Sequence, residues 1–238
     1  MKASRIIGHR GLASLAPENT LVSIKAAAQH NIDWVEVDAS ILGDATVVLC
    51  HDDTLERCSN SQGSLLNITS EHLPSIDAGR WFSEEFSGEQ IPTLTKALKL
   101  ISSLNMGLNL ELKPQEGISP QKITALIHPT IKKHWSSSKP LLISSFDHDI
   151  LRYYRQLDLE QPLGLLYEEI DSDWHNTMQE LNAVSLHCDW ECLTPRLAHA
   201  ITAAGYQLIV YTCNDSSAAK ELWGMGVNSI ISDTPHLL

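Results

Sequence analysis

Residues 183–212 read AVSLHCDWECLTPRLAHAITAAGYQLIVYT, and this stretch decides the fold. A short apolar run stands at each of its ends, as is typical of buried strands, and the segment between them carries the signals of a helix. Thr194 followed by Pro195 predicts a capping residue and a first-turn proline, and Gly205 predicts the helix stop. A strand, a helix and a strand in this order predict two parallel strands of one sheet.

The same alternation continues along the chain. Within the helical segment, Leu197, Ala200, Ile201 and Ala204 stand at positions i, i+3, i+4 and i+7, which predicts a single buried stripe. Nine apolar runs are candidate strands: Arg5–Gly8, Trp34–Ile41, Val47–His51, Gly107–Glu111, Leu141–Ser144, Pro162–Tyr167, Ala183–His187, Gln207–Thr212 and Ser229–Ile231.

Strand–helix alternation over 238 residues predicts a parallel α/β sheet, and we expect it to close into an eight-stranded TIM-type (β/α)8 barrel. An open doubly wound sheet is the alternative, but the chain has neither of the standard glycine-rich phosphate loops. No linker divides the sequence into two cores. Residues 1–238 are therefore predicted to form a single barrel domain.

One of the nine runs exceeds what an eight-stranded barrel needs. The link between the second and third runs is far too short for a parallel crossover, so these two are expected to form an antiparallel hairpin. If the turn is centred between Asp44 and Ala45, Asp38 faces His51, and Glu36 shares that face because side chains alternate along a strand. We therefore expect Glu36, Asp38 and His51 to converge.

Residues 52–93 interrupt the alternation directly after His51. The stretch is polar at first and mixed afterwards, without a clear period. Connections of this length are usually functional lids or small subdomains. We therefore expect an inserted lid at one rim of the barrel.

Composition restricts the partners and the compartment. With 17 Lys and Arg against 29 Asp and Glu, the formal net charge is −12, which disfavours nucleic acid and stable membrane association. No stretch approaches the roughly 18 apolar residues of a membrane span, and the first residues lack the apolar core of a signal peptide. The five cysteines form no CxxC pair, which favours free thiols in a reducing compartment. A cytoplasmic protein with a small-molecule partner is expected, and a homo-oligomer remains an open option.

Polar side chains stand at or near the ends of the first four runs: His9, Arg10, Glu36, Asp38, His51, Glu111 and Lys113. In a TIM-type barrel the carboxyl ends of the strands meet at the rim that carries the active site. Each of these residues alone is more often structural. Carboxylates, histidines and cations at four successive strand ends favour a catalytic site instead.

The residue types in this set indicate a particular chemistry. Glu36, Asp38 and Glu111 need a positive charge between them, because like charges a few ångström apart disfavour joint ionisation, and they suit one divalent cation, Mg²⁺ or Ca²⁺. The two histidines suit general acid/base work at neutral pH. Arg10 and Lys113 suit phosphate oxygens, so the set describes metal-assisted phosphodiester cleavage. A glycosidase would use two of the carboxylates but would leave the histidines and the arginine without roles.

The same residues belong to a series of ordered motifs. The chain carries, in order, Gly8-His9-Arg10-Gly11, Pro17-Glu18-Asn19-Thr20, Glu36-x-Asp38, His51-Asp52, Leu55-Glu56-Arg57, Glu111-Leu112-Lys113 and Ser232-Asp233-Thr234-Pro235. With these motifs the sequence resembles the glycerophosphodiester phosphodiesterase family, and in particular its compact cytosolic bacterial members.

The resemblance implies a TIM-type barrel enzyme. Its reaction would be the hydrolysis of glycerophosphodiesters, such as glycerophosphocholine and glycerophosphoethanolamine, to sn-glycerol 3-phosphate and an alcohol. It further implies one divalent cation, Mg²⁺ or Ca²⁺, on the three carboxylates, with His9 and His51 as the general acid/base pair. Arg10 would hold the phosphate, with Lys113 nearby.

The resemblance also bears on the substrate pocket. Glu18 would lie near the metal or behind it, although the segment around it also reads as the start of a helix capped by Asn19 or Thr20. Trp81, Phe146 and Tyr211 are the candidate apolar contacts for substrate, with a plain core role as the alternative.

Two other functions would use the same barrel. A lysophospholipase D-like enzyme would need an apolar groove at the barrel mouth for an acyl chain. A catalytically inactive binding module would need damage to the carboxylates or histidines, and both sets are intact in the sequence.

Overall fold

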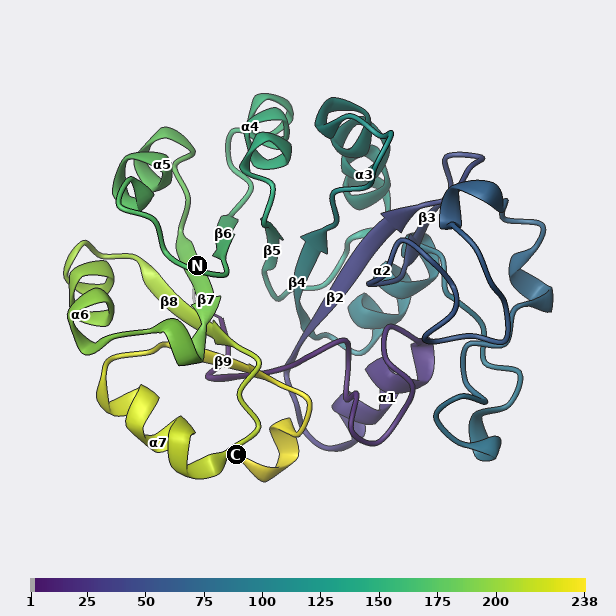
Figure 1. The fold of residues 1–238 in the computed structure, drawn as a ribbon, viewed down its shortest axis with the longest axis horizontal. Coiled ribbons are helices and arrows are strands. Elements are labelled where there is room, and N and C mark those ends of the chain that lie inside the picture. The colour runs from purple at the N-terminus through teal and green to yellow at the C-terminus, as the bar shows by residue number, and fades with distance from the viewer. Residues whose placement is uncertain (1–2) are drawn as a thin grey trace.

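The computed structural model describes residues 3–238 and contains all nine predicted strands (Figure 1). They are β1 (Ile6–Gly8), β2 (Trp34–Ile41), β3 (Val47–Leu49), β4 (Gly107–Leu112), β5 (Leu141–Ser145), β6 (Leu163–Tyr167), β7 (Ser185–Asp189), β8 (Gln207–Tyr211) and β9 (Ser229–Ser232). The α-helices of the same residues are α1 (Leu21–Gln29), α2 (Leu94–Ser103), α3 (Pro120–His134), α4 (His148–Leu157), α5 (Trp174–Glu180), α6 (Pro195–Ala203) and α7 (Ser216–Gly224).

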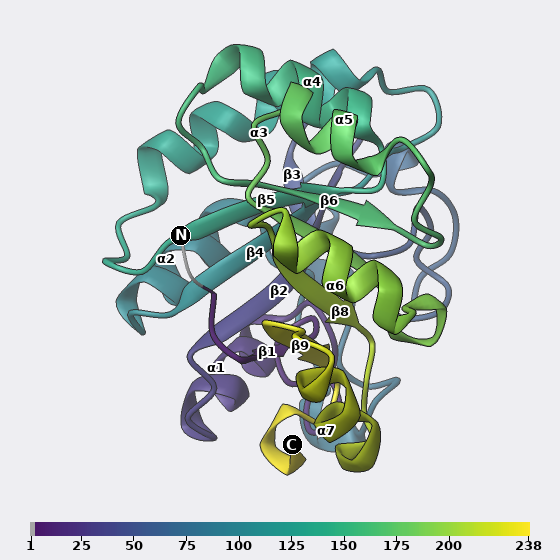
Figure 2. The ribbon, with the colours of Figure 1, turned by 90° about the vertical axis from the view of Figure 1, so that its left-hand side faces the viewer.

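Eight of the strands form a closed parallel barrel, so the predicted TIM-type fold is confirmed. Around the barrel the order is β1, β2, β4, β5, β6, β7, β8 and β9, and β9 pairs again with β1. The helices lie outside the strands as a ring, which the two views show from different sides (Figures 1 and 2). Each helix returns the chain to the same end of the barrel, so the carboxyl ends of all eight strands share one rim.

The ninth strand, β3, pairs antiparallel with the outer half of β2, as predicted, but the register differs by one residue. Leu42 N–H donates to the Thr46 carbonyl at 2.9 Å, and Ala45 between them has a φ of +69°. This is a three-residue turn that ends with a left-handed residue, so its centre lies on Asp44 and not between Asp44 and Ala45 as predicted. The predicted pairing of Asp38 with His51 is therefore wrong. His51 lies beyond the last paired residue of β3, and strand alternation does not fix where its side chain points.

Helix α6 begins where the sequence predicts, but its buried face differs in part from the predicted stripe. Thr194 caps it as predicted, with its side chain accepting a hydrogen bond from the third residue of the helix. Its buried residues are Ala198 and Ile201, whereas Ala200 and Ala204 are exposed, so the predicted stripe is wrong at these two positions. Alanines occur on several faces of this helix, and the apolar pattern therefore fits more than one rotation about its axis.

The barrel interior changes character along the strands. Toward the amino ends it is filled by apolar side chains, which are Ile7, Trp34, Leu142, Ile209 and Ile231. Trp34 points to the same side of β2 as Glu36 and Asp38, because side chains two apart share a face. The apolar layer thus closes the barrel floor directly beneath the polar side chains of the rim.

The insertion at residues 52–93 has a small core of its own. It contains three short 3₁₀ helices, at Leu65–Asn67, Leu73–Ser75 and Glu84–Phe86. Its apolar side chains pack against the β2–β3 hairpin in one cluster: Leu42, Val48, Leu55, Leu65, Leu73, Ile76, Ala78 and Ile91. In Figure 1 the insertion lies beside β3 and α2. Within residues 3–238, no helix combines the length and the apolar character needed to cross a bilayer.

Candidate active site

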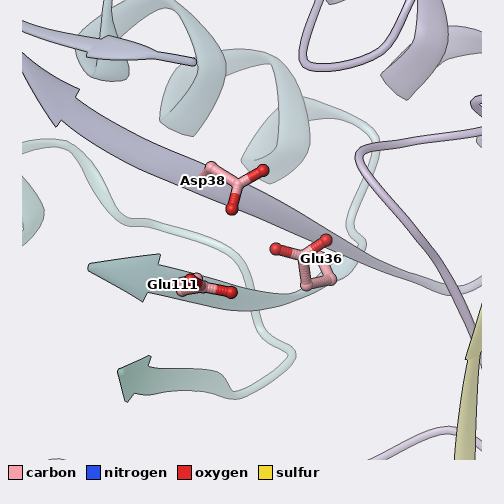
Figure 3. A group of neighbouring side chains, drawn as sticks. All are labelled: Glu36, Asp38 and Glu111. Carbon is pink, nitrogen blue, oxygen red and sulfur yellow. The ribbon is translucent and has the colours of Figure 1, made fainter. Parts of the chain in front are cut away.

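Three buried carboxylates meet inside the barrel. Glu36 and Asp38 come from β2 and Glu111 from β4, and the parallel register sets Asp38 beside Glu111. One oxygen from each carboxylate lies within 4.8 Å of the others (Figure 3). The structure therefore brings together the three residues that the sequence suggested as metal ligands.

The three carboxylates repel one another, and burial and this repulsion raise the pKa of two of them. Burial raises the pKa of Glu36 well above its ordinary value, and repulsion from Asp38 and Glu111 adds to this. Burial and Asp38 raise the pKa of Glu111 to about 7, although Lys113 opposes the shift. The Lys113 Nζ lies 2.8 Å from the Glu111 Oε1 and 3.9 Å from the Asp38 Oδ1. Together with Arg10, described below, Lys113 supplies two positive charges against three carboxylates.

Two buried oxygens in this group have no hydrogen-bond partner among the described residues. They are the Glu36 Oε1 and the Asn109 Oδ1. Asn109 stands next to Glu36 in the register of β2 and β4, and it lines the same cavity. Buried polar atoms are normally satisfied, so a ligand is expected here. Carboxylate and amide oxygens are hard donors, and the residues present therefore fit a divalent cation.

Arg10 links this group to the loop after β1. Its backbone N–H donates to the Glu36 Oε2 at 3.1 Å, its Nε lies 3.4 Å from the Asp38 Oδ2, and its Nη1 lies 2.6 Å from the Glu18 Oε1. Burial works to lower the pKa of Arg10, but Asp38, Glu18 and Glu36 outweigh it and raise the pKa. The guanidinium therefore stays charged at the wall of the cavity.

His9 is held by an aspartate from the far end of the chain. Its Nδ1 lies 2.7 Å from the Asp233 Oδ1, and its Nε2 lies 3.9 Å from the Glu36 Oε2. Asn214 donates to the second oxygen of Asp233 at 2.9 Å. Burial would raise the pKa of Asp233, but the His9 contact prevails and lowers it, so Asp233 is ionised and accepts the Nδ1 proton. The Nε2 is then left on the side of the carboxylates.

His51 repeats this arrangement with a different supporting group. Its Nδ1 lies 2.6 Å from the Asp52 Oδ1, and Arg57 holds Asp52 in turn, with its Nε 2.7 Å from the Oδ2. Chiefly through Arg57, the pKa of Asp52 falls to about 2. Burial lowers the pKa of His51 below its usual range, so the ring is predominantly neutral at pH 7.

These groups line one cavity of about 250 Å³: His9, Arg10, Glu36, His51, Asn109, Glu111, Phe146, Leu166, Tyr211, Thr212 and Ile231. The Phe146 and Tyr211 rings meet edge to face, with centroids 5.8 Å apart. Trp81 is absent from this wall. Its indole N–H donates to the Ala78 carbonyl within the insertion, and 41% of the residue is exposed, so the structure does not bring it to the cavity.

A wider hollow of about 980 Å³ adjoins the cavity and shares Phe146, Leu166 and Tyr211 with it. Its remaining wall carries four carboxylates, from Glu168, Glu169, Asp171 and Asp189. None of the described residues that line this hollow is a lysine or an arginine. The hollow is thus a polar, negatively charged approach to the site.

Sequence reasoning missed several supporting residues. Of the two predicted caps, Asn19 and Thr20, Thr20 is the cap of α1. Asn19 instead donates to the Asp38 Oδ2 at 2.8 Å. Asn109 could have been found, because it precedes Glu111 by two residues and shares its face. Asp233 lies 224 residues from His9, and no local pattern connects them.

The chain is similar to known proteins along almost its whole length. The profile of the glycerophosphoryl diester phosphodiesterase family matches residues 9–237. The chain belongs to this family. It is accordingly a phosphodiesterase, a member of the hydrolases.

Individual members of the family resemble the chain along almost its whole length. A glycerophosphodiester phosphodiesterase of Caldanaerobacter subterraneus subsp. tengcongensis is 31% identical, covering 98% of this chain and 95% of that protein. A phosphodiesterase structure from Oleispira antarctica, in complex with the product sn-glycerol-3-phosphate, is 37% identical with a TM-score of 0.96, covering 99% of this chain and 95% of that one. A glycerophosphodiester phosphodiesterase structure from Agrobacterium tumefaciens is 25% identical with a TM-score of 0.81, covering 98% of both chains.

Proposed function

We propose that this enzyme hydrolyses glycerophosphodiesters to sn-glycerol 3-phosphate and an alcohol. The observation that carries the proposal is a pair of histidines, His9 and His51, that line one cavity together with Glu36 and Glu111 of the carboxylate triad. Each has its Nδ1 on an aspartate and its Nε2 free for proton transfer. The product bound in the Oleispira antarctica relative supports the choice of substrate.

Glu36, Asp38 and Glu111 would hold one divalent cation, Mg²⁺ or Ca²⁺, with Asn109 beside them. When bound, such a cation would neutralise the triad and withdraw charge from the phosphodiester oxygens. Arg10 would bind a phosphate oxygen at the cavity wall, and Lys113, which does not line the cavity, would add a positive charge beside Glu111.

The two histidines would divide the proton transfers between them. Neutral His51 suits the base, which takes a proton at its Nε2 from the attacking water as the water oxygen bonds to phosphorus. His9 then gives a proton to the alcohol oxygen as the P–O bond to it breaks. The aspartates behind the rings fix each tautomer, so that each Nε2 is the atom that exchanges the proton.

The adjoining hollow supports a small polar alcohol as the leaving group. Its four carboxylates would attract the ammonium group of glycerophosphocholine or glycerophosphoethanolamine. A lysophospholipase D-like reaction would place an acyl chain against the same charged wall, which is unfavourable. The hollow therefore favours the deacylated substrates.

A panel assay tests the proposal. Release of the alcohol is measured from glycerophosphocholine, glycerophosphoethanolamine and a lysophospholipid, each with Mg²⁺, Ca²⁺ or EDTA, and sn-glycerol 3-phosphate is measured as the second product of the first two. Activity on the first two that EDTA abolishes is expected. Equal activity on the lysophospholipid would favour the acylated substrate, and binding of glycerophosphocholine without turnover in either metal would favour a binding module.

A further inference from the structure

We infer that Arg57, from the insertion, is a positioning residue that serves both His51 and Arg10. It would act on His51 through Asp52 and on Arg10 through Glu18. The inference rests on the roles proposed above for His51 and Arg10. It makes the insertion part of the catalytic apparatus.

Arg57 binds two carboxylates from different parts of the chain. Its Nε and Nη2 lie 2.7 and 3.0 Å from the two oxygens of Asp52. Its Nη1 and Nη2 lie 2.8 Å from the two oxygens of Glu18, which stands in the loop between β1 and α1. Both contacts are two-pronged, the geometry in which a guanidinium restricts a carboxylate most strongly.

On the Asp52 side, Arg57 fixes the partner of His51. A carboxylate bound at both oxygens cannot turn away from the imidazole, whose Nδ1 lies 2.6 Å from the Asp52 Oδ1. Because His51 lies beyond the paired part of β3, no strand register holds it. Its orientation therefore depends on Asp52, and through Asp52 on Arg57.

On the Glu18 side, Arg57 limits how firmly Arg10 is held. Glu18 lies between the two arginines, 2.6 Å from the Arg10 Nη1 and 2.8 Å from the Arg57 Nη2. While Arg57 neutralises Glu18, the charge of Arg10 remains available to a phosphate. Without Arg57, Glu18 would pair with Arg10 alone and compete with the substrate for it.

The insertion also supplies a matched control. Arg80 is another arginine of this segment, and its Nη2 lies 3.1 Å from the Glu84 Oε1 and 2.9 Å from the Ser87 Oγ. None of these partners lines the cavity. Arg80→Gln removes the same charge from the same segment without touching His51 or Arg10.

The two roles of Arg57 can be separated by steady-state kinetics on glycerophosphocholine. Arg57→Gln is expected to lower kcat roughly 10- to 100-fold, as loss of an orienting partner does. It should also raise KM roughly tenfold, because a charge-assisted bond now competes for Arg10. Adding Glu18→Gln removes the competitor, so the double variant should recover KM to within about threefold of the wild type while kcat stays low.

These kinetic results can support or overturn the role inferred for Arg57. The inference is overturned if Arg57→Gln behaves like Arg80→Gln, or if the double variant is worse than Arg57→Gln in both parameters. If Arg57→Gln does not fold by circular dichroism, Arg57→Lys replaces it. Lysine keeps the charge but not the fork, so KM near the wild-type value with a lowered kcat is expected, and any other result overturns the inference. An inactive wild type would contradict the proposed function instead.

Discussion

The two ends of the barrel interior are built on the same strands, but one end is apolar and the other carries buried charges. Toward the amino end of β2, Trp34 packs with Leu142 and other apolar side chains. Two and four residues further along β2, Glu36 and Asp38 lie buried beside Glu111. The first layer excludes water from the barrel, whereas the second places like charges where water cannot screen them.

This difference shows how the fold divides its tasks. Burial of apolar side chains stabilises the folded state, while buried carboxylates without a cation destabilise it. Substitutions at the polar end are therefore expected to change the stability little and the activity strongly. Substitutions at the apolar end are expected to change the stability strongly and the activity little.

The largest effect is expected from replacing two carboxylates. Glu36→Gln with Asp38→Asn should lower kcat/KM roughly 10⁴-fold, because several kcal/mol of metal-assisted stabilisation is lost. The melting temperature of the EDTA-treated protein should rise, since the amides keep the shape and remove the repulsion. Asp33→Asn is the control, because Asp33 is 66% exposed and pairs with Lys139. Wild-type activity in the double variant would contradict the metal assignment.

The histidines should come next. His9→Ala and His51→Ala are each expected to lower kcat roughly 10²- to 10⁴-fold, the usual effect of losing a positioned acid or base. Thermal unfolding of both should remain close to that of the wild type. The exposed His199 on α6 provides a control that should leave kcat unchanged. An effect on kcat as small as that of His199→Ala would remove that histidine from the proposed pair.

The apolar end should respond in the opposite way. Leu142→Ala, at a fully buried position on β5, is expected to lower the free energy of unfolding by about 2–5 kcal/mol through the cavity that it leaves. Urea unfolding measures this loss. The kcat of the folded fraction at low temperature should change little, and a loss as large as that of His9→Ala would refute the separation of the two layers.

The smallest effect concerns pH. In the metal-free protein the pKa of Glu111 is raised to about 7 in the folded state from an ordinary 4.5. The folded state therefore binds a proton that the unfolded chain has released, and stability should fall as the pH rises from about 4.5 through 7. In EDTA the melting temperature is therefore expected to be several degrees lower at pH 7 than at pH 5. Glu111→Gln should flatten this slope, and an unchanged slope in that variant would show that Glu111 is not its source.

Much of this architecture could be predicted because it follows from local patterns. Alternating strands and helices led to the barrel, and the spacing of Glu36 and Asp38 along one strand placed both on the same face. The register of the hairpin could not be predicted in this way. It depends on Ala45 adopting a left-handed conformation, which shortens the turn by one residue, and alanine gives no signal of that.

The aspartate partners of the two histidines also differ in whether the sequence could predict them. Asp52 follows His51 directly and belongs to a motif that the sequence displays. Asp233 reaches His9 only because β9 closes the barrel against β1, so the contact is a product of the whole topology. The structure does not place Trp81 in the pocket, where the sequence predicted it. The insertion has its own core, and the ring of Trp81 is bound within the insertion, away from the cavity.

The distance along the chain between His9 and Asp233 has a consequence for protein synthesis. His51 and its aspartate leave the ribosome together, but His9 emerges 224 residues before the group that orients it. The strand that closes the barrel, β9, is equally late, because it spans Ser229–Ser232. If His9 and His51 act as proposed, a growing chain lacks a complete pair of proton-transfer groups until β9 has emerged. Hydrolysis would then begin only after β9 has closed the barrel.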